Sequence, residues 1–294
     1  MGTEDISRRY RGIETWPDPE VLETLVEAQL SGVAAVRAAL TALASAAEAA
    51  VARLRRGGRL VYAGAGTSIR LGVQDGVELT PTYGWLADRT VFLVAGGYDA
   101  LTKAIEGAED DRAAGAAAAR SEDLGKLDVT IAISASGQTP YTLGAVEEAR
   151  NLGALTIGIA CNPDAPLLTS VEHRVLIDTG PESIAGSTRL KAGTAQKVTL
   201  NLLSTLIMIR LGRVFDGLMV DVVATNAKLR TRTVTMLSQI TGVNEASAQA
   251  ALASANGQLK LAVMIATGLP PEAGQRLLDE HNGDLTRALK STRA

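Results

Sequence analysis

The spacing of apolar residues divides the chain into three regions. From Val21 to Arg56, leucines and valines recur every three or four positions, which predicts a long helical region. It follows the helix-starting prolines Pro17 and Pro19, and Ser31-Gly32 marks an expected break. We assign residues 1–56 to this N-terminal helical segment.

In the second region, short apolar runs alternate with helical patterns. The runs predict five strands, in "GGRLVYAGAGTS" after residue 56 and at Thr90–Gly97, Asp128–Gly137, Ala154–Pro163 and His173–Gly180. Helical patterns fall between them, at about 68–79, 99–120 and 140–152. This alternation predicts an α/β domain over residues 57–239, a doubly wound parallel sheet flanked by helices. Ligands of such folds bind at the carboxyl ends of the strands.

The third region is helical and carries an internal repeat. One set of residues recurs 26 positions later: Gly242, Gln249, Leu252, Asn256-Gly257 and Leu259 return as Gly268, Gln275, Leu278, Asn282-Gly283 and Leu285. Each copy predicts two short helices joined by Asn-Gly. We therefore expect residues 240–294 to form a small all-helical appendage without catalytic residues.

Composition narrows the functional classes. The net charge of −3 argues against a nucleic-acid or anionic-membrane surface. The single cysteine, Cys161, excludes an intrachain disulfide and indicates a reducing compartment, while two histidines make a multi-histidine metal site improbable. The N-terminus lacks a signal-peptide pattern, and no apolar run approaches the roughly 20 residues of a membrane span. We expect a cytoplasmic protein with no membrane or nucleic-acid partner.

Two strand-to-helix loops have the composition of phosphate sites. "AGAGTSIR" (63–70) offers Gly66, Thr67 and Ser68, and "SASGQTPY" (134–141) offers Ser134, Ser136, Gln138 and Thr139. Backbone N–H groups at a helix start and nearby hydroxyls suit an anion. The first loop lacks the third glycine of GxGxxG and the lysine of a Walker loop, so a phosphomonoester fits better than a nucleotide. Taken singly, each loop is also compatible with an ordinary turn and cap, with Thr139 capping the following helix.

A third polar segment, "GSTRLKAGTAQK" (186–197), precedes an apolar helix. It contains Ser187, Arg189 and Lys191. Cations at a helix N-terminus oppose the helix dipole, which favours a bound anion over a purely structural role. A solvated helix start remains the alternative.

Two glutamates are candidates for acid–base chemistry. Glu78 precedes the helix-breaking "TPTYG", and about ten residues of helix separate it from Ser68, or roughly 15 Å. It is therefore expected to serve a phosphate other than one bound at Ser68 of its own helix. Glu106 and Glu109 in "EGAEDDR" share the face of an expected helix, where a solvated surface role is the usual one.

Taken together, these motifs resemble one family, the N-acetylmuramic acid 6-phosphate etherases of the sugar isomerase (SIS) fold. The resemblance runs from about Gly57 to the C-terminus and rests on "GGRLVYAGAGTSIRLG", "PTYG", "EGAEDDR", "ASGQTPY", "GIACNP", "GSTRLKAGTAQK" and "LMVDVVATNAKLR". It implies a cytoplasmic homodimer that converts N-acetylmuramic acid 6-phosphate to N-acetylglucosamine 6-phosphate and D-lactate in cell-wall recycling. No metal or organic cofactor is implied.

The resemblance also implies a mechanism and residue roles. The family reaction opens the sugar ring, removes the proton at carbon 2, expels lactate and adds water, which requires an acid and a base. The family's proton-donating glutamate corresponds to Glu78, and its second catalytic glutamate to Glu109. Substrate binding falls to the two phosphate-type loops and to Ser187, Arg189 and Lys191.

The chain departs from the family pattern at several positions. Gln138 stands where arginine or lysine is common, Ile69 replaces a glycine, and Gly76-Val77 replaces a small pair ending in serine. "TEDISRRYRGIETWP" replaces an Asn/Ser-rich N-terminal stretch. Two alternatives stay open: a sugar-phosphate isomerase of the same fold, and a non-catalytic sugar-phosphate-binding regulator. Retention of Glu78 and Glu109 favours the etherase.

Overall fold

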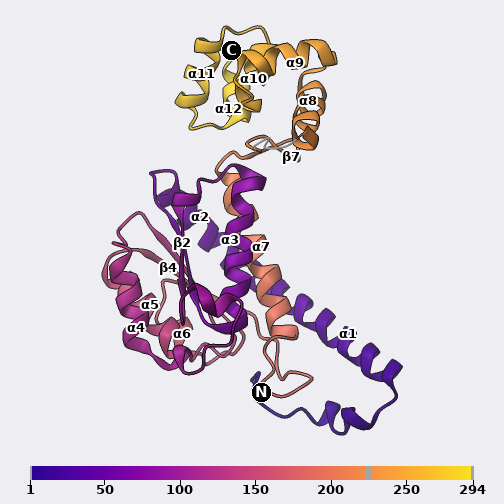
Figure 1. Cartoon of the computed structure of the whole chain (residues 1–294), viewed down its shortest axis with the longest axis vertical. Helices are drawn as coiled ribbons and strands as arrows, with labels where there is room; N and C mark the ends of the chain where they lie inside the picture. Colours follow the sequence, from indigo (N-terminus) through magenta and orange to yellow (C-terminus); the bar gives the residue numbers. More distant parts are fainter. Residues whose placement is uncertain (1, 223–226, 293–294) are drawn as a thin grey trace. The chain divides into compact units, whose positions relative to one another are not determined.

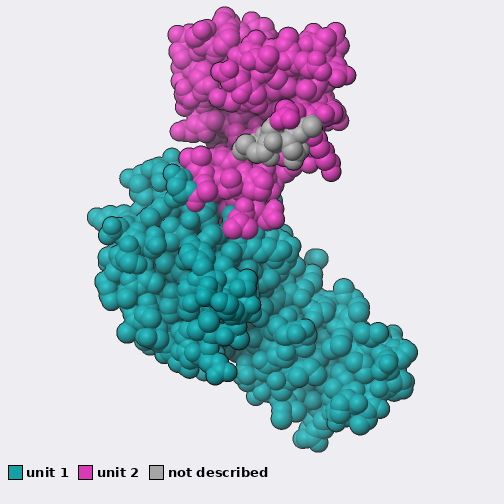
Figure 2. Space-filling view, viewed as in Figure 1, with its two compact units in different colours: residues 1–76, 88–206 teal, residues 77–87, 207–294 magenta. Residues whose placement is uncertain are grey.

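The computed structural model describes residues 2–222 and 227–292 and contains two compact units. Unit 1 comprises residues 1–76 and 88–206, and unit 2 comprises residues 77–87 and 207–294 (Figure 2). Each unit is described by itself below. The three-segment division at residues 56 and 239 stays a prediction.

Unit 1 is built on a five-stranded parallel sheet in the order β2-β1-β3-β4-β5. The strands are β1 (Leu60–Gly64), β2 (Thr90–Val94), β3 (Val129–Ile133), β4 (Leu155–Ala160) and β5 (His173–Leu176). β1, β3 and β4 are buried along their whole length, as expected of a sheet covered on both faces. The predicted doubly wound sheet is thus confirmed, with each strand inside its predicted run.

Helices cover both faces of the sheet (Figure 1). α4 (Arg112–Ser121) and α5 (Pro140–Asn151) lie on one side, while α2 (Leu40–Leu54), α3 (Gly66–Tyr83) and α7 (Lys191–Arg210) lie on the other. A short helix, α6 (Pro166–Thr169), links β4 to β5. Alternate side chains of β1 divide between the faces: Val61 packs with α5, and Tyr62 stacks on Phe92 beneath α3.

The N-terminal helical region breaks later than expected. α1 (Asp18–Ala35) runs through Ser31-Gly32, and a 3-10 turn at Val36–Ala39 separates it from α2. Gly32 is needed for contact rather than for a break, because a Cβ there would lie 2.8 Å from the carbonyl oxygen of Lys191. The predicted break was wrong because close packing against α7 requires the same residue type.

The stretch Asp18–Leu54 is also long and apolar enough to cross a membrane, judged by length and composition alone. The mean hydropathy of its most apolar window of 18 residues is 1.5, and 33% of that window is buried in the protein. The core helix of a soluble protein passes the same test.

The helix predicted over 99–120 is largely absent. Two 3-10 turns, Tyr98–Leu101 and Ala108–Asp110, occupy its first half, and α4 begins only at Arg112. Gly107 has φ +72°, and the Asp111 carboxylate caps α4 by accepting the N–H of Ala114 at 2.8 Å. Glu106 and Glu109 therefore do not share a helical face.

The helix predicted over 68–79 extends further at both ends. α3 begins at Gly66 and continues through Pro81 to Tyr83. The end of the helix was expected at "TPTYG", but only its last residue, Gly84, lies beyond the helix.

Unit 2 contains the end of α3, a small hairpin of β6 (Val214–Phe215) and β7 (Leu218–Met219), and α8 (Ala227–Thr241). The repeat follows as α9 (Glu245–Ser254) with α10 (Leu259–Ala266), then α11 (Pro271–Glu280) with α12 (Leu285–Ser291). Residues 223–226 of the "LMVDVVATNAKLR" motif lie outside the described residues.

The two copies of the repeat use the same turn. Asn256 and Asn282 have φ of 51° and 53°, and the glycine after each is also left-handed. Gly257 donates to the carbonyl of Leu252 at 2.8 Å, and Gly283 to that of Leu278 at 2.7 Å. Asn and Gly recur because both adopt this backbone conformation readily.

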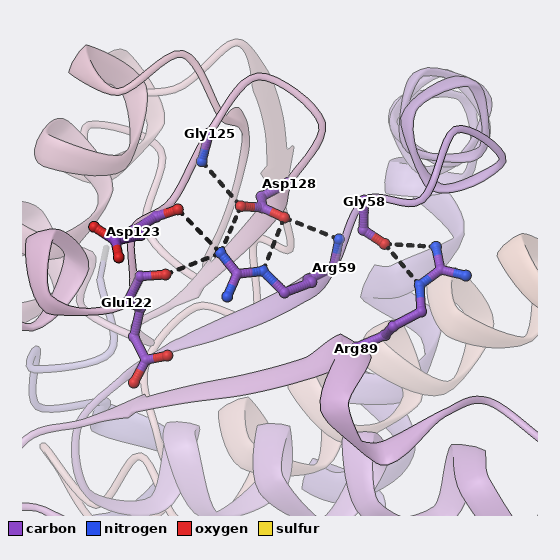
Figure 3. Close-up of polar contacts among 7 residues, drawn as sticks. All are labelled: Gly58, Arg59, Arg89, Glu122, Asp123, Gly125 and Asp128. Atoms are coloured by element: carbon purple, nitrogen blue, oxygen red, sulfur yellow. Dashed lines mark hydrogen bonds and ion pairs between the residues drawn. The ribbon is translucent and has the colours of Figure 1, made fainter.

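The amino-terminal edge of the sheet is closed by an ion pair (Figure 3). Asp128, before β3, accepts hydrogen bonds from Nε and Nη2 of Arg59, before β1, at 3.1 and 2.9 Å. The backbone N–H groups of Arg59 and Gly125 donate to the same carboxylate at 3.0 and 2.9 Å. Nη2 of Arg59 also donates to the carbonyls of Glu122 and Asp123, so the guanidinium links three residues of this edge.

Candidate functional site

The candidate site lies at the opposite, carboxyl-terminal edge of the same two strands. β1 lies between β2 and β3. The chain therefore passes from β1 to β2 on one side and then crosses to β3 on the other side. The loops after β1 and β3 are therefore neighbours at a topological switch point, the usual ligand position in such sheets. A cavity of about 390 Å³ opens there. Its lining includes Glu4, Gly66, Thr67, Ser68, Glu109, Asp110, Ser134, Ser136, Gln138, Thr139, Gly186 and Thr188.

The loop after β3 forms a cluster of hydroxyls. Ser134 Oγ lies 2.9 Å from Thr139 Oγ1 and 3.4 Å from Ser136 Oγ, and accepts the N–H of Gly137 at 3.0 Å. Thr139 occupies the N-cap position of α5, but its side chain makes no capping bond, because it turns to Ser134 instead. The expected cap was wrong. The hydroxyl cluster lies at the start of α5, where oxygens of a phosphate are stabilised.

The loop after β1 is tied to α7. Ser68 is buried and its Oγ donates to Oε1 of Gln196 at 3.1 Å. Two turns further along α3, the buried Asp75 accepts hydrogen bonds from Asn201 at 2.7 Å and Ser204 at 3.0 Å. Burial raises the pKa of the Asp75 carboxyl despite these bonds. α3 is thus held against α7, which leaves Gly66 and Thr67 to face the cavity.

The N-terminal segment forms part of the cavity wall, which the sequence did not reveal. Thr3 is fully buried, and its N–H donates to Oδ1 of Asn162, after β4, at 2.9 Å. Gly186 donates its N–H to the carbonyl of Thr3 at 3.2 Å. These bonds place Glu4 in the lining with Glu109 and Asp110. Both stretches stand out in the sequence, "TED" as a departure from the family pattern and "GIACNP" as a family motif. Nothing in the sequence shows that they are in contact.

The cationic segment before α7 has an internal counter-charge. The buried Glu182 accepts the N–H groups of Lys191 and Ala192, at 3.2 and 2.9 Å, so the anion at this helix start belongs to the chain itself. Burial raises the pKa of Glu182, and burial lowers the pKa of Lys191, which is 5% exposed. Part of the positive potential at this helix start is therefore neutralised by the chain itself.

The predicted site residues separate into two groups. The cavity brings together Gly66, Thr67, Ser68, Ser134, Ser136, Gln138, Thr139 and Glu109. Within residues 2–222 and 227–292, Ser187, Arg189 and Lys191 do not line it, although their neighbours Gly186 and Thr188 do. Glu78 lies on the part of α3 that belongs to unit 2, and its side chain is exposed. None of these assignments is thereby excluded, and each stays a prediction.

A larger cavity, about 580 Å³, lies within unit 2. Its wall contains both Asn-Gly turns of the repeat and Lys260, whose ammonium binds Asp221 at 2.5 Å. Over the described part of the chain, no group of three His, Cys, Asp or Glu side chains is arranged to hold a metal ion.

Two family models match the chain. The N-terminal SIS domain of the glucokinase regulatory protein matches residues 42–150, and the SIS domain matches residues 112–206. The two matches together span β1–β5, both loops of the cavity and most of α7. They identify the sheet and its flanking helices as a SIS fold.

Curated relatives match nearly the whole chain. An N-acetylmuramic acid 6-phosphate etherase of Deinococcus radiodurans is 52% identical over 94% of this chain and 91% of its own. Etherases of the same name from Streptomyces avermitilis and Serratia proteamaculans are 44% and 46% identical, over 98% and 87% of this chain and 93% and 86% of theirs. Among solved structures, a phosphoheptose isomerase of Francisella tularensis has a TM-score of 0.49 at 16% identity and covers 66% of this chain and all of its own.

Proposed function

This chain belongs to the N-acetylmuramic acid 6-phosphate etherase family, and we propose that it cleaves the D-lactyl ether of N-acetylmuramic acid 6-phosphate. The products are N-acetylglucosamine 6-phosphate and D-lactate, and the pathway is cell-wall recycling. The observation that carries the proposal is the cavity at the switch point, whose lining contains both a hydroxyl cluster and carboxylates.

The hydroxyl cluster is the proposed phosphate site. Ser136 and Thr139 each lie within hydrogen-bond range of Ser134, so the three hydroxyls converge on one small volume. Their hydroxyls and the first turn of α5 supply neutral donors, which compensates for the absence of a cation at Gln138. A cavity of about 390 Å³ is within the usual range for a small-molecule site.

The carboxylates supply the proposed acid and base. In the open-chain sugar, a base takes the proton from carbon 2, and the bond from carbon 3 to the ether oxygen then breaks. The departing lactate oxygen takes a proton from the acid, and water adds at carbon 3 of the unsaturated aldehyde. We assign the acid to Glu78 and the second catalytic function to Glu109, which lines the cavity. Which of them handles the carbon 2 proton stays open.

We further propose a cytoplasmic homodimer. Four apolar side chains on α1 are exposed at helical spacing, namely Leu22, Val26, Leu30 and Val33, with exposed fractions of 63, 58, 63 and 39%. A continuous apolar stripe of this kind suits the same helix of a second copy. Sedimentation of the purified protein as a single chain would contradict the dimer.

Two alternatives share the phosphate site: a sugar-phosphate isomerase and a non-catalytic sensor. Neither needs an acid for a lactate leaving group. Incubation with N-acetylmuramic acid 6-phosphate separates them, because only the etherase releases D-lactate. Tight binding of the sugar without lactate would support the sensor, and interconversion of an aldose and a ketose phosphate would support the isomerase.

A further inference from the structure

A second, smaller cavity adjoins the candidate active site. Its volume is about 270 Å³, and it shares Ala65, Gly66, Thr67 and Glu109 with the 390 Å³ cavity of the candidate site. The rest of its wall comes from α3 and the segment between β2 and α4. Unlike the 390 Å³ cavity, it is lined by two cations, Arg70 and Lys103.

Arg70 fixes the segment that carries Lys103. Its Nε and Nη2 donate to the carbonyl of Ala100 at 3.1 and 2.8 Å, and Nη2 also donates to the carbonyl of Lys103 at 3.1 Å. A guanidinium that bridges two carbonyls constrains the backbone between them. The position of Lys103 beside the cavity is thus set by backbone contacts that a change of its side chain would leave in place.

The Lys103 ammonium is available to an incoming anion. Its partner is Asp99, with Nζ and Oδ2 3.3 Å apart, and the two side chains are 67% and 77% exposed. Such exposed pairs contribute little, so an anionic ligand can replace Asp99 at small cost. The opposing charges at this cavity are Glu106 and Glu109, both on exposed backbone turns.

We propose that this second cavity receives the carboxylate of the substrate's lactyl group, with Lys103 as its counter-ion. The inference rests on the proposed function and names a subsite of the same active site. The muramic acid phosphate carries two anionic groups, the phosphate on carbon 6 and the lactyl carboxylate joined through carbon 3, and the phosphate is assigned to the Ser134 cluster. Glu109, on the wall common to both cavities, then lies between these two groups, where the ether bond must be.

The subsite has a consequence for specificity. N-acetylglucosamine 6-phosphate has the same phosphate but no lactyl carboxylate, so it should gain nothing from Lys103. Substrate and product are then distinguished by one charge-assisted contact, which is typically among the stronger polar interactions. The same contact orients the leaving group, because the carboxylate that it holds stays on lactate when the ether bond breaks.

The test compares Lys103→Gln with a matched control, Lys126→Gln, an exposed lysine before β3. For each protein we would measure KM and kcat for N-acetylmuramic acid 6-phosphate, and the inhibition constant of N-acetylglucosamine 6-phosphate. Lys103→Gln should raise KM about tenfold and leave the inhibition constant unchanged. Lys126→Gln should change neither. Glu106→Gln, which removes a like charge, should lower KM slightly.

Two results would overturn the subsite: an unchanged KM in Lys103→Gln, or equal losses for substrate and product. Failure of the proposed function itself would look different, since the wild-type protein would then release no lactate. In that case the dissociation constants of the two sugars replace the kinetic ones. A wild-type preference for the muramic acid phosphate that Lys103→Gln removes would still support the subsite, and its persistence would reject it.

Discussion

The two edges of the sheet in unit 1 use the same pair of strands in opposite ways. At the amino-terminal edge, the Asp128 carboxylate receives hydrogen bonds from Arg59 and Gly125, and its side chain is only 9% exposed (Figure 3). Nearby, Arg89 donates to the carbonyls of Leu54 and Gly58 at 2.6 Å. The polar groups of this edge bind one another.

At the carboxyl-terminal edge the polar groups face a cavity. Ser134, Ser136 and Thr139 converge without enclosing a charge, and Glu109 is exposed on a turn beside them. A site that must accept an anionic substrate has to leave donors accessible, which sacrifices stability that the other edge retains. The amino-terminal edge thus holds the sheet together through its own polar contacts, while the carboxyl-terminal edge is the one that we propose binds substrate.

The largest expected effect is the loss of activity without loss of stability when either proposed catalytic glutamate is changed. Glu78→Gln or Glu109→Gln should lower kcat for lactate release by about 10²–10⁴-fold, because each removes one proton-transfer group. Glu78→Gln should still allow exchange of the carbon 2 proton with deuterated water. The matched control is Glu172→Gln, an exposed carboxylate next to the start of β5, which should retain full activity. Normal turnover in either active-site variant would remove that glutamate from the mechanism.

The next effect should appear at the amino-terminal edge, with the opposite signature. Asp128→Asn should lower the free energy of unfolding by about 2 kcal/mol, because the partly buried Arg59 loses its charged partner. KM and kcat should stay within twofold of the wild type, since the change lies at the far end of β3. A large loss of kcat with unchanged stability would break the comparison between the edges.

The same carboxylate gives a pH dependence. Burial acts to raise the pKa of Asp128, but the hydrogen bonds from Arg59 and Gly125 outweigh it, so its pKa lies below the ordinary value. The stabilisation is therefore complete above the unfolded pKa, about 3.9, and is lost as the pH falls through the lower folded value. The free energies of unfolding of the wild type and Asp128→Asn should differ by a constant amount near neutral pH, and this difference should disappear in acid. A difference that grew in acid would contradict this assignment.

A smaller effect is expected from the hydroxyl cluster. Ser134→Ala removes the oxygen shared by Ser136, Thr139 and Gly137, and should raise KM for the sugar phosphate about tenfold, with a smaller change in kcat. Ser170→Ala, at the end of α6, removes a surface hydroxyl bonded to the carbonyl of Pro166 and should leave KM unchanged. Equal KM values in the two variants would exclude the cluster as the phosphate site.

The sequence predicted the local features of this fold well. The five strands and α5 follow from apolar runs and from Pro140, and the repeat turns follow from Asn-Gly, because these signals depend on neighbouring residues alone. The strand alternation also predicted that both Gly- and Ser-rich loops follow the carboxyl ends of strands, and in the structure both line one cavity.

The sequence-based predictions failed where contacts between residues far apart in the chain determine the structure. Gly32 was taken for a helix break, but it is retained for contact with Lys191. Glu182 neutralises the α7 start from a loop, and Glu4 reaches the cavity because Thr3 is bound by Asn162. No local pattern announces such pairs. The absent helix over 99–111 is different, since Gly107 and the capping Asp111, which mark the break before α4, are visible in the sequence.

We propose that the carboxyl-terminal edge of the sheet in unit 1 is part of an etherase active site. The most direct measurement is D-lactate released from N-acetylmuramic acid 6-phosphate by the purified protein, followed together with N-acetylglucosamine 6-phosphate. We expect equal amounts of both products from the wild type, and little of either from Glu109→Gln. Wild-type protein that binds the sugar phosphate without forming lactate would contradict this proposal.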